Sequence, residues 1–210
     1  MTLFDSLHLG RPKPKAGCSP VEVNAHFQKW IGPDDGRSLQ DGFIDVRHIP
    51  ATENLPYDVI HTSGMSSHPL KTKKGEEEFA EFMMLLPPDG FLGHDPEWPV
   101  REMHRFAQMF HEMSAGVAEF ITIPIAEPAT GTSFSALMTI RPYFLPPMFH
   151  HLHLAQDRSV AIFALMPLLI VEHKYVIAQT EPGALWRLAQ YQQRDPLELC
   201  AVDIRRQPVA

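Results

Sequence analysis

The sequence is poor in several features that would each indicate a particular class of protein. Its 210 residues include only two cysteines, Cys18 and Cys200, and neither lies in a Cys-x-x-Cys pair. A disulfide-stapled fold is therefore not indicated, and we expect two reduced thiols. The longest apolar run, residues 161–171, is interrupted by Pro167 and is shorter than the ~20 residues that span a bilayer. No signal-peptide pattern opens the chain, so we expect a cytoplasmic protein.

Positive charge is also scarce and dispersed. The formal net charge is −7, and the basic residues form only short clusters, such as Lys71-Lys73-Lys74 and Arg205-Arg206. Phosphate backbones and anionic lipids are bound by grouped Lys and Arg side chains. The charge pattern therefore disfavours nucleic acids and membranes as partners.

Glycine is outnumbered by proline, with 12 residues against 20. The prolines lie between apolar runs, where they separate short elements and fix loops. Hydrophobic residues make up 44% and charged residues 20% of the chain, as is typical of globular proteins. We therefore expect one domain over residues 19–210, preceded by an extended arm over residues 1–18, whose Arg11-Pro12-Lys13-Pro14-Lys15 segment disfavours a helix.

The hydrophobic periodicity predicts helices and strands in a mixed order. Ser19, Pro20 and Glu22 have the pattern of a helix start with a capping box. Residues 79–86 are apolar on both faces apart from Glu81, which favours a central strand over the alternative of a short helix. The predicted helices are 19–31, 98–114, 171–179 and 181–193, and the predicted strands are 42–49, 57–62, 79–86, 120–125, 133–140, 159–169 and a short final strand at 199–204. This order indicates an α/β (α+β) domain in which helices flank a mixed, largely antiparallel sheet.

Twelve histidines raise the question of a metal site. The zinc peptidase motif requires a second histidine four residues after the first, but Ala115 stands at that position after His111-Glu112. His151 and His153 would point the same way from a strand, as zinc ligands can. No Cys or carboxylate lies at ligand spacing beside them, and no glycine-rich cofactor motif is present. We therefore predict no cofactor and no metal; if a metal binds, His151 and His153 would be its ligands.

The loop from Gly64 to His68, Gly-Met-Ser-Ser-His, partly matches the Gly-x-Ser-x-Gly nucleophile elbow of serine hydrolases. The final glycine is replaced by His68, and nothing in the sequence fixes a third catalytic residue beside His61 or His68. The other interpretation is a tight turn in which Gly64 adopts dihedral angles that other residues avoid. A serine or metal-dependent hydrolase that uses His61, His68 or the His-rich loop at residues 150–153 is therefore the alternative function.

The segment Tyr57–Leu70, YDVIHTSGMSSHPL, is similar to a strand–Gly-Met-Ser–loop signature of the suppressor of fused family. Further features follow in the family's order: a strand that ends Leu-Leu-Pro-Pro at residues 85–88, and a Trp98-Pro99 pair that opens a helix. The resemblance covers residues 40–193. Family members often carry Gly-His after this helix, where this chain has residues 119–124, and the larger animal members have a second domain. A stand-alone bacterial member is the closer comparison.

The resemblance implies a single domain without catalytic activity that binds another protein. Animal members hold a transcription factor of the Hedgehog pathway, and bacterial relatives are suggested to act as immunity proteins that neutralise toxins. An acidic surface would suit a basic toxin because complementary charge speeds association, so we take the loop and the acidic segment 76–81 as the contact surface. A domain that only dimerises through its Met- and Phe-rich surfaces is a third interpretation, and the sequence leaves the oligomeric state open. The candidate contact residues are Gly64, Met65, Ser66, Ser67, His68, Glu76 and Glu77.

Overall fold

The computed structural model describes residues 17–71, 75–88, 95–113, 115–127, 132–154 and 158–209. The predicted arm lies outside the described residues apart from Gly17 and Cys18. The helices are α1 (Pro20–Trp30), α2 (Trp98–Glu112), α3 (Ile170–Ala178), α4 (Ala184–Tyr191) and α5 (Pro196–Cys200), and the short 3-10 helices are η1 (Met65–Ser67) and η2 (Pro147–Phe149). The strands are β1 (Ser38–Asp41), β2 (Ile44–Ile49), β3 (Asp58–Ser63), β4 (Leu70–Lys71), β5 (Glu77–Leu86), β6 (Thr122–Pro124), β7 (Phe134–Ile140), β8 (His151–His153) and β9 (Ser159–Leu169).

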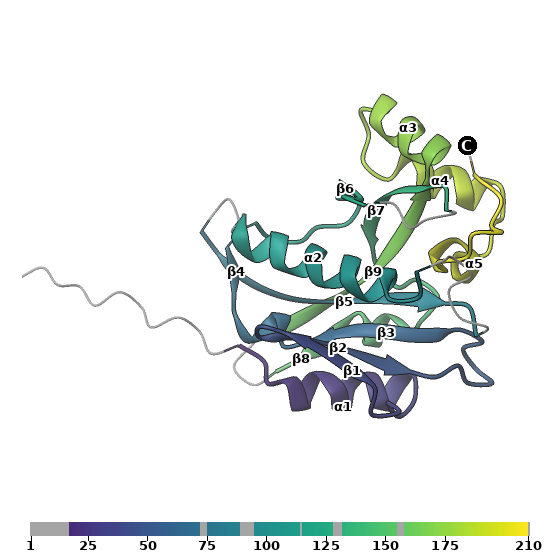
Figure 1. Ribbon diagram of the computed structural model, residues 1–210. Coiled ribbons are helices and arrows are strands. Elements are labelled where there is room, and N and C mark those ends of the chain that lie inside the picture. Colours follow the sequence, from purple (N-terminus) through teal and green to yellow (C-terminus); the bar gives the residue numbers. More distant parts are fainter. Residues whose placement is uncertain are drawn as a thin grey trace, which may run out of the picture.

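The strands form one sheet in the order β1-β2-β3-β5-β9-β7-β6, with β4 added to β5 and β8 added to β9 (Figure 1). The central neighbours β5 and β9 run parallel, with Phe79 opposite Val160. The other strand pairs in the described part of the chain are antiparallel. The predicted mixed, largely antiparallel sheet with flanking helices is therefore confirmed.

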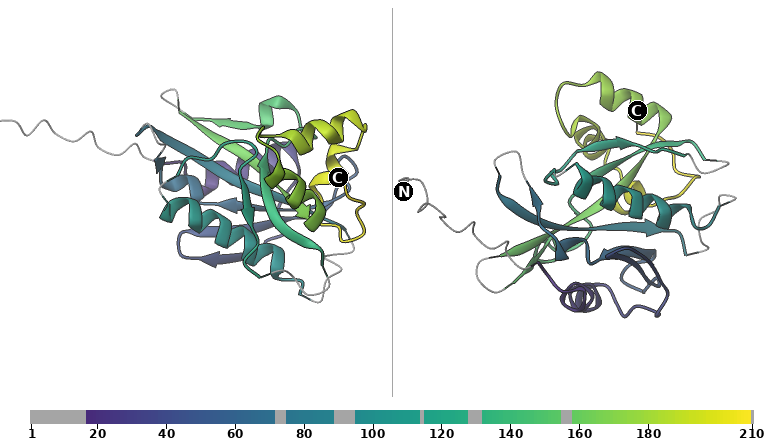
Figure 2. Two further views of the ribbon diagram at one scale, coloured as in Figure 1. Left: turned by 90° about the horizontal axis from the view of Figure 1, so that it is seen from above. Right: turned by 60° about the vertical axis from the view of Figure 1, so that its left-hand side comes forward.

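The sheet is covered on both faces, because the side chains of β5 and β9 alternate between two hydrophobic cores. Phe79, Met83 and Leu85 face the core that contains α1, α4 and α5. Phe82 and Met84 face the core that contains α2. The views of Figure 2 show α1 and α2 on opposite sides of the strands. Since a strand buried on both faces is apolar throughout, this position explains the composition of β5.

Helix α1 begins as the sequence predicts. The Ser19 hydroxyl accepts a hydrogen bond from the Glu22 N–H, and the Glu22 carboxylate accepts one from the Ser19 N–H at 3.0 Å. These two bonds satisfy N–H groups that a helix start leaves without intrahelical partners. The buried side chains Val23 and Phe27 then fix α1 against the sheet.

The structure differs from the predicted elements in the tail and in its short strands. The predicted final strand at residues 199–204 is wrong, because Asp195 caps a short helix, α5, by accepting from the Leu197 N–H at 2.9 Å, and Pro196 opens it. A single β-bridge, between Ala201 and Leu85, pairs the described part of this tail with a strand. Strands β1 and β4 were not predicted. Of the two interpretations of residues 150–153, a strand and a polar loop, the structure has the strand β8, which pairs with β9.

Cys18 and Cys200 are both free and buried. Burial, together with the nearby Glu22 carboxylate, raises the pKa of Cys18 to about 12, and burial raises the pKa of Cys200 as well. Both thiols therefore stay protonated and unreactive near neutral pH. No helix in the described part of the chain is long and apolar enough to cross a membrane.

Candidate functional site

The loop between β3 and β4 is built on Gly64. Its φ angle of 109° lies in the left-handed region, and a Cβ atom added to it would come within 2.3 Å of the Phe43 carbonyl oxygen. Glycine is required here both for the dihedral angle and for the close approach. The prediction of a tight turn at Gly64 is confirmed, and the turn leads into the 3-10 helix η1.

A buried carboxylate holds this loop from below. Glu81, on β5, is 0% exposed. Its Oε1 atom accepts hydrogen bonds from the Gly64 N–H at 3.2 Å, the Ser66 N–H at 2.9 Å and the Ser66 hydroxyl at 2.7 Å. Thr62 donates to Oε2 at 2.5 Å. The sequence places Glu81 in the acidic contact segment 76–81; that placement is wrong, because Glu81 is an internal support of the loop.

The segment before α1 covers the same loop from outside. The Cys18 N–H donates to the Ser66 carbonyl at 2.9 Å, and the Ser67 hydroxyl donates to the Cys18 carbonyl at 3.0 Å. A Cβ atom on Gly17 would lie only 2.2 Å from the Ser67 carbonyl oxygen. Ser66 is fully buried beneath this segment, and Met65 is fully buried in the core that contains α2. Gly64, Met65 and Ser66 therefore shape the loop, and only its far end reaches the surface.

That end forms an aromatic group with Phe43, which the sequence did not single out, and with His111, which the sequence considered only for a metal motif. The ring of the exposed His68 lies 4.5 Å from that of Phe43, and the ring of His111 lies 5.0 Å from that of Phe43, centroid to centroid. Phe43 is 41% exposed. His111 donates from Nε2 to the Met65 carbonyl at 3.1 Å, which joins α2 to the loop. A phenylalanine directly after Gly42, at the tip of a β-hairpin, is the sequence signal that marks Phe43.

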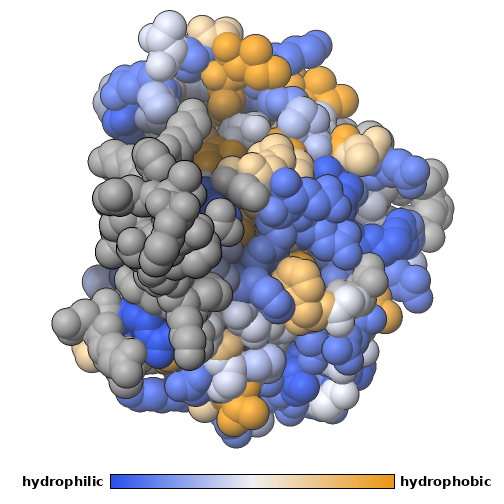
Figure 3. Space-filling view, turned by 90° about the vertical axis from the view of Figure 1, so that its left-hand side faces the viewer, coloured by the Kyte–Doolittle hydropathy of each residue, from blue (hydrophilic) through white to orange (hydrophobic). Residues whose placement is uncertain are grey.

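The acidic residues lie close to this group because of a strand pairing. In the β4–β5 ladder, Leu70 is opposite Glu78 and Lys71 is opposite Glu77. Glu76 is exposed and Glu77 is half-buried. The face on which β4 lies is mainly hydrophilic, with hydrophobic side chains gathered at its upper edge, at the height of α3 (Figure 3). The structure thus brings the two predicted segments onto one side of the sheet.

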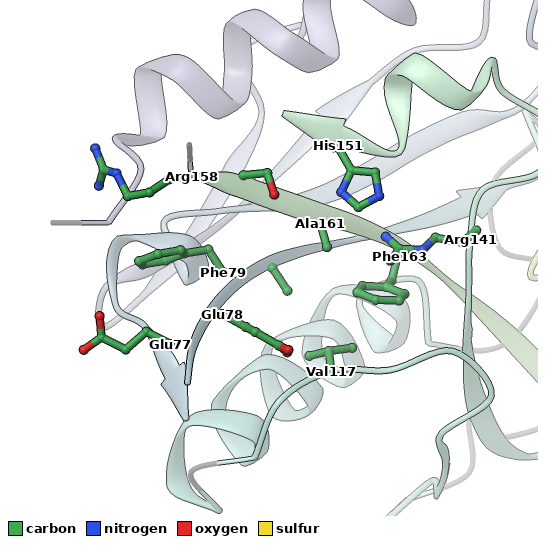
Figure 4. A pocket seen from close by; sticks show the side chains of 11 residues that line it. Glu77, Glu78, Phe79, Val117, Arg141, His151, Arg158, Ala161 and Phe163 are labelled. Carbon is green, nitrogen blue, oxygen red and sulfur yellow. The ribbon is translucent and has the colours of Figure 1, made fainter. Parts of the chain in front are cut away.

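A pocket of about 310 Å³ begins beside the acidic residues. Glu77 and Glu78 lie on one side of it, His151 of β8 on another, and Arg141 extends into it from the chain after β7 (Figure 4). Burial lowers the pKa of the Arg141 guanidinium, and burial together with the charge of Arg141 lowers the pKa of His151. The pocket therefore carries both signs of charge. Arg141 was not predicted as a site residue, because in the sequence it is one of the dispersed basic residues.

The side chains proposed for hydrolase chemistry do not form a catalytic group. The Ser66 hydroxyl is buried and donates to Glu81, whereas a nucleophilic serine needs an adjacent base and access to substrate. His61 is 1% exposed and is stacked on Phe27 at 3.8 Å between ring centroids. His151 and His153 lie side by side with ring centroids 6.3 Å apart, and the described residues contain no group of three His, Cys, Asp or Glu side chains that could hold a metal ion.

Comparison with protein families decides the relationship. The family model described as suppressor of fused protein (SUFU) matches residues 41–206. The chain belongs to the SUFU family. The match covers β2 through the residues that follow α5, including the Gly64 loop and its support Glu81. A comparison with curated proteins gives no significant match.

Solved structures show the same fold at low sequence identity. A SUFU homologue from Neisseria gonorrhoeae FA 1090 is similar with a TM-score of 0.65 and 17% identity, over 91% of this chain and 96% of that one. A chain of a Sufu–Fu complex has a TM-score of 0.61 and 14% identity, over 94% and 93% of the two chains. Drosophila Suppressor of Fused has a TM-score of 0.59 and 14% identity, and the match covers 94% of this chain but 52% of the Drosophila chain.

Proposed function

We propose that this SUFU-family chain is a non-catalytic domain that binds a protein partner. The observation that carries the proposal is the construction of the Gly64 loop: Glu81 holds it from below and the segment at Cys18 covers it, so that His68 is presented at the surface on a rigid base. Contact residues fixed by buried hydrogen bonds lose little conformational entropy on binding. The similarity to a chain of a Sufu–Fu complex supports a protein as the ligand.

The proposed contact surface consists of five residues: Phe43, Ser67, His68, Glu76 and Glu77. Phe43 and His68 form its aromatic part. Aromatic residues often contribute most of the energy of a protein interface. Glu76 and Glu77 form its acidic part, and they lie one strand away from the loop through the β4–β5 pairing. Gly64, Met65 and Ser66 take part through the shape of the loop, because all three residues are buried.

We further propose that the partner is a basic toxin domain and that the chain acts as its immunity protein in the cytoplasm. The net charge of −7 supports a basic partner, since opposite charges raise the association rate and favour the correct orientation. The match over 96% of the Neisseria chain supports a comparison with a bacterial protein of similar extent. The buried, unreactive thiols suit a reducing compartment.

The test begins with the gene next to the one that encodes this chain. If it encodes a large protein with a basic C-terminal toxin domain, that domain is purified and titrated against this chain by calorimetry. We expect a 1:1 complex. The double variant Glu76→Lys/Glu77→Lys should weaken it about tenfold or more, mainly through slower association, and Phe43→Ala should weaken it by a similar factor. Tyr191→Ala is the matched control, since Tyr191 is an 86% exposed aromatic residue on α4.

Two results would contradict the proposal at different levels. If the complex forms but neither surface variant changes its dissociation constant, the chain binds a protein through a different surface, and the proposed contact surface is rejected. If the toxin domain does not bind, and co-purification with mass spectrometry identifies a different protein partner, the immunity role is rejected. Circular dichroism of each variant shows whether a loss of binding comes from a loss of folding.

A further inference from the structure

The pocket at the junction of β5, β8 and β9 has an unusual basic end. It is lined by the ring of Phe163, the side chain of His151 and the guanidinium group of Arg141. Figure 4 shows these three side chains together at one end of the pocket, whereas Phe79 and Arg158 lie at the other. The volume of about 310 Å³ is at the lower end of the range for small-molecule sites.

The guanidinium group of Arg141 is fixed in place but makes few polar contacts. Its central carbon lies 4.3 Å from the centroid of the Phe163 ring, a cation–π contact that defines the orientation of the group. Its hydrogen bonding to the described residues is limited to one long bond, 3.5 Å, from Nη1 to the His150 carbonyl, and it forms no ion pair with a described carboxylate. An arginine side chain has five N–H donors, so most of the donors of this half-buried group have no protein acceptor among the described residues.

Charged groups from every side of the pocket determine what fits beside Arg141. His151 of β8 adds a second hydrogen-bonding group at the same end. Glu78 extends into the pocket from β5, and Glu77 and Arg158 lie towards its other end. Glu119, whose carboxylate accepts a hydrogen bond from the backbone N–H of Arg141 at 3.2 Å, adds a third negative charge near the guanidinium group. These carboxylates disfavour a dianion such as phosphate. A carboxylate is planar, carries a single charge and can accept two parallel N–H hydrogen bonds, so it fits the donor geometry of the guanidinium group.

We propose that this pocket binds a carboxylate group through Arg141 and His151. The carboxylate belongs either to a small organic acid or to an acidic side chain of a protein, and the chemistry at the guanidinium is the same in both cases. The site does not depend on the proposed protein partner, because its walls come from this chain alone. The negative charge of Glu78 repels a bound carboxylate, so we expect only moderate affinity.

Two probes test the proposal on the complete chain without any partner. Propionate, which carries a single negative charge, represents a free acid, and the blocked peptide acetyl-Gly-Glu-Gly-amide represents an acidic side chain; the peptide with Gln in place of Glu is the negative probe. Binding is followed by the ¹H–¹⁵N NMR signals of the Arg141 side chain and of the Ala161 and Phe163 amides, at constant ionic strength. We expect saturable shifts with a dissociation constant on the order of 1 mM, as for a fragment-sized ligand.

Three variants make the expectation specific. Arg141→Gln should weaken binding about tenfold or more by removal of the fork. Glu78→Gln should strengthen binding about two- to fivefold by removal of the opposing charge, and it keeps the test decisive if Arg141→Gln does not fold. Arg187→Gln on α4, an exposed arginine paired with Glu181, should change nothing.

The outcomes separate the two sources of the carboxylate. A lower dissociation constant for the Glu peptide than for propionate assigns the site to a protein side chain, and the reverse assigns it to a free acid. The absence of saturation by either probe up to about 20 mM overturns the proposal, as does equal binding of the Gln peptide or unchanged binding in both pocket variants. None of these results depends on whether the toxin partner exists.

Discussion

Glu81 receives both the N–H and the hydroxyl of Ser66 on one carboxylate oxygen, at 2.9 and 2.7 Å, inside the core of the domain. The two residues are 15 positions apart, and the bonds join the central strand β5 to the Gly64 loop. No cation balances this carboxylate in the described structure; its partners are N–H and O–H groups. Burial therefore raises its pKa, against the opposing effect of its hydrogen bonds.

The first prediction concerns replacement of Glu81. Glu81→Ala leaves the buried donors of Gly64, Ser66 and Thr62 without an acceptor, which should destabilise the domain by about 3 kcal/mol or more. Glu81→Gln keeps an acceptor oxygen and resembles the protonated carboxyl group, so it should cost much less. Urea unfolding measures both, and Glu78→Ala on the same strand is the exposed control. Equal losses for the Ala and Gln variants would contradict this role of the carboxylate.

The raised pKa of Glu81 adds a pH dependence. The folded state binds the proton more tightly than the unfolded state, so this contribution to stability is full below the ordinary value of 4.5 and is lost as pH rises through the raised pKa. The stability of the wild-type chain should therefore fall relative to that of Glu81→Gln as pH rises from about 5 to 8. Unfolding free energies of both proteins at matched pH values provide the comparison; a constant difference between them would refute the raised pKa.

The second prediction concerns His61, whose titration acts in the opposite direction. Burial lowers its pKa to about 4, against the bond that it donates to the Thr62 carbonyl. The folded state disfavours the charged imidazole, so stability is full above the ordinary value of 6.5 and falls as pH drops towards 4. The loss amounts to about 3 kcal/mol from this residue.

His61→Phe is the variant that tests it. A phenyl ring keeps the stacking on Phe27, which lies 3.8 Å away between ring centroids, and does not titrate. Between pH 7 and 4 the unfolding free energy of the wild-type chain should decrease by about 3 kcal/mol more than that of His61→Phe. Parallel pH profiles for the two proteins would show that His61 is not the group responsible.

The sequence predicts local features well where the determining residues are neighbours. Ser19, Pro20 and Glu22 define the start of α1, and the apolar run of β5 identifies a central strand. The burial of Glu81 was not predictable in the same way, because its donors lie on another strand and its loop. The glutamates before it, the exposed Glu76 and Glu78 and the half-buried Glu77, give the charge pattern of a solvated edge. Pairing partners distant in the chain, rather than composition, determine which of these carboxylates is internal.

The candidate site shows the same limit. The loop from Gly64 and the acidic pair Glu76 and Glu77 stand out in the sequence, but their proximity depends on the two-residue strand β4. Arg141 has no local signal at all, since its environment comes from Phe163 and His151 on other strands. The tail was predicted as a strand from its apolar residues, but the cap formed by Asp195 starts a helix instead.

The third prediction separates the two reasons for glycine at position 64. Gly64 and Gly36 both have positive φ angles, of 109° and 79°, but a Cβ atom at Gly36 would meet nothing within 4 Å, whereas one at Gly64 would meet the Phe43 carbonyl at 2.3 Å. Gly36→Ala should cost about 1–2 kcal/mol for the dihedral angle alone. Gly64→Ala must also move the β1–β2 hairpin, so its loss of unfolding free energy should exceed that of Gly36→Ala by 2 kcal/mol or more, by analogy with about 1–3 kcal/mol for overpacking. Thermal and urea unfolding compare the pair, and equal losses would reject the steric argument.

The fourth prediction concerns the tail, which is held by an ion pair with no exposure to solvent. Arg206 donates from Nη1 and Nη2 to the two oxygens of Glu172 at 2.6 and 2.7 Å, and both side chains are 0% exposed. Glu172 also accepts from the Leu169 and Val209 N–H groups, at 2.9 Å each. Arg206→Met leaves the carboxylate buried without its cation, which should cost about 3–5 kcal/mol.

A double-mutant cycle tests whether charge is the cause. Glu172→Gln in the Arg206→Met background removes the unpaired charge while retaining an acceptor for the backbone, so the double variant should recover a large part of the loss. Limited proteolysis should cut the residues after α5 faster in Arg206→Met than in the wild-type chain or the double variant, because these residues are anchored to α3 through this pair. Arg205→Met is the matched control. It removes the same kind of side chain one position away, but the Arg205 side chain is 57% exposed and is bonded to Asp203. If the losses of unfolding free energy in the cycle are additive and all variants are cleaved at the same rate, the apolar packing of the tail, and not the ion pair, is the source of its stability.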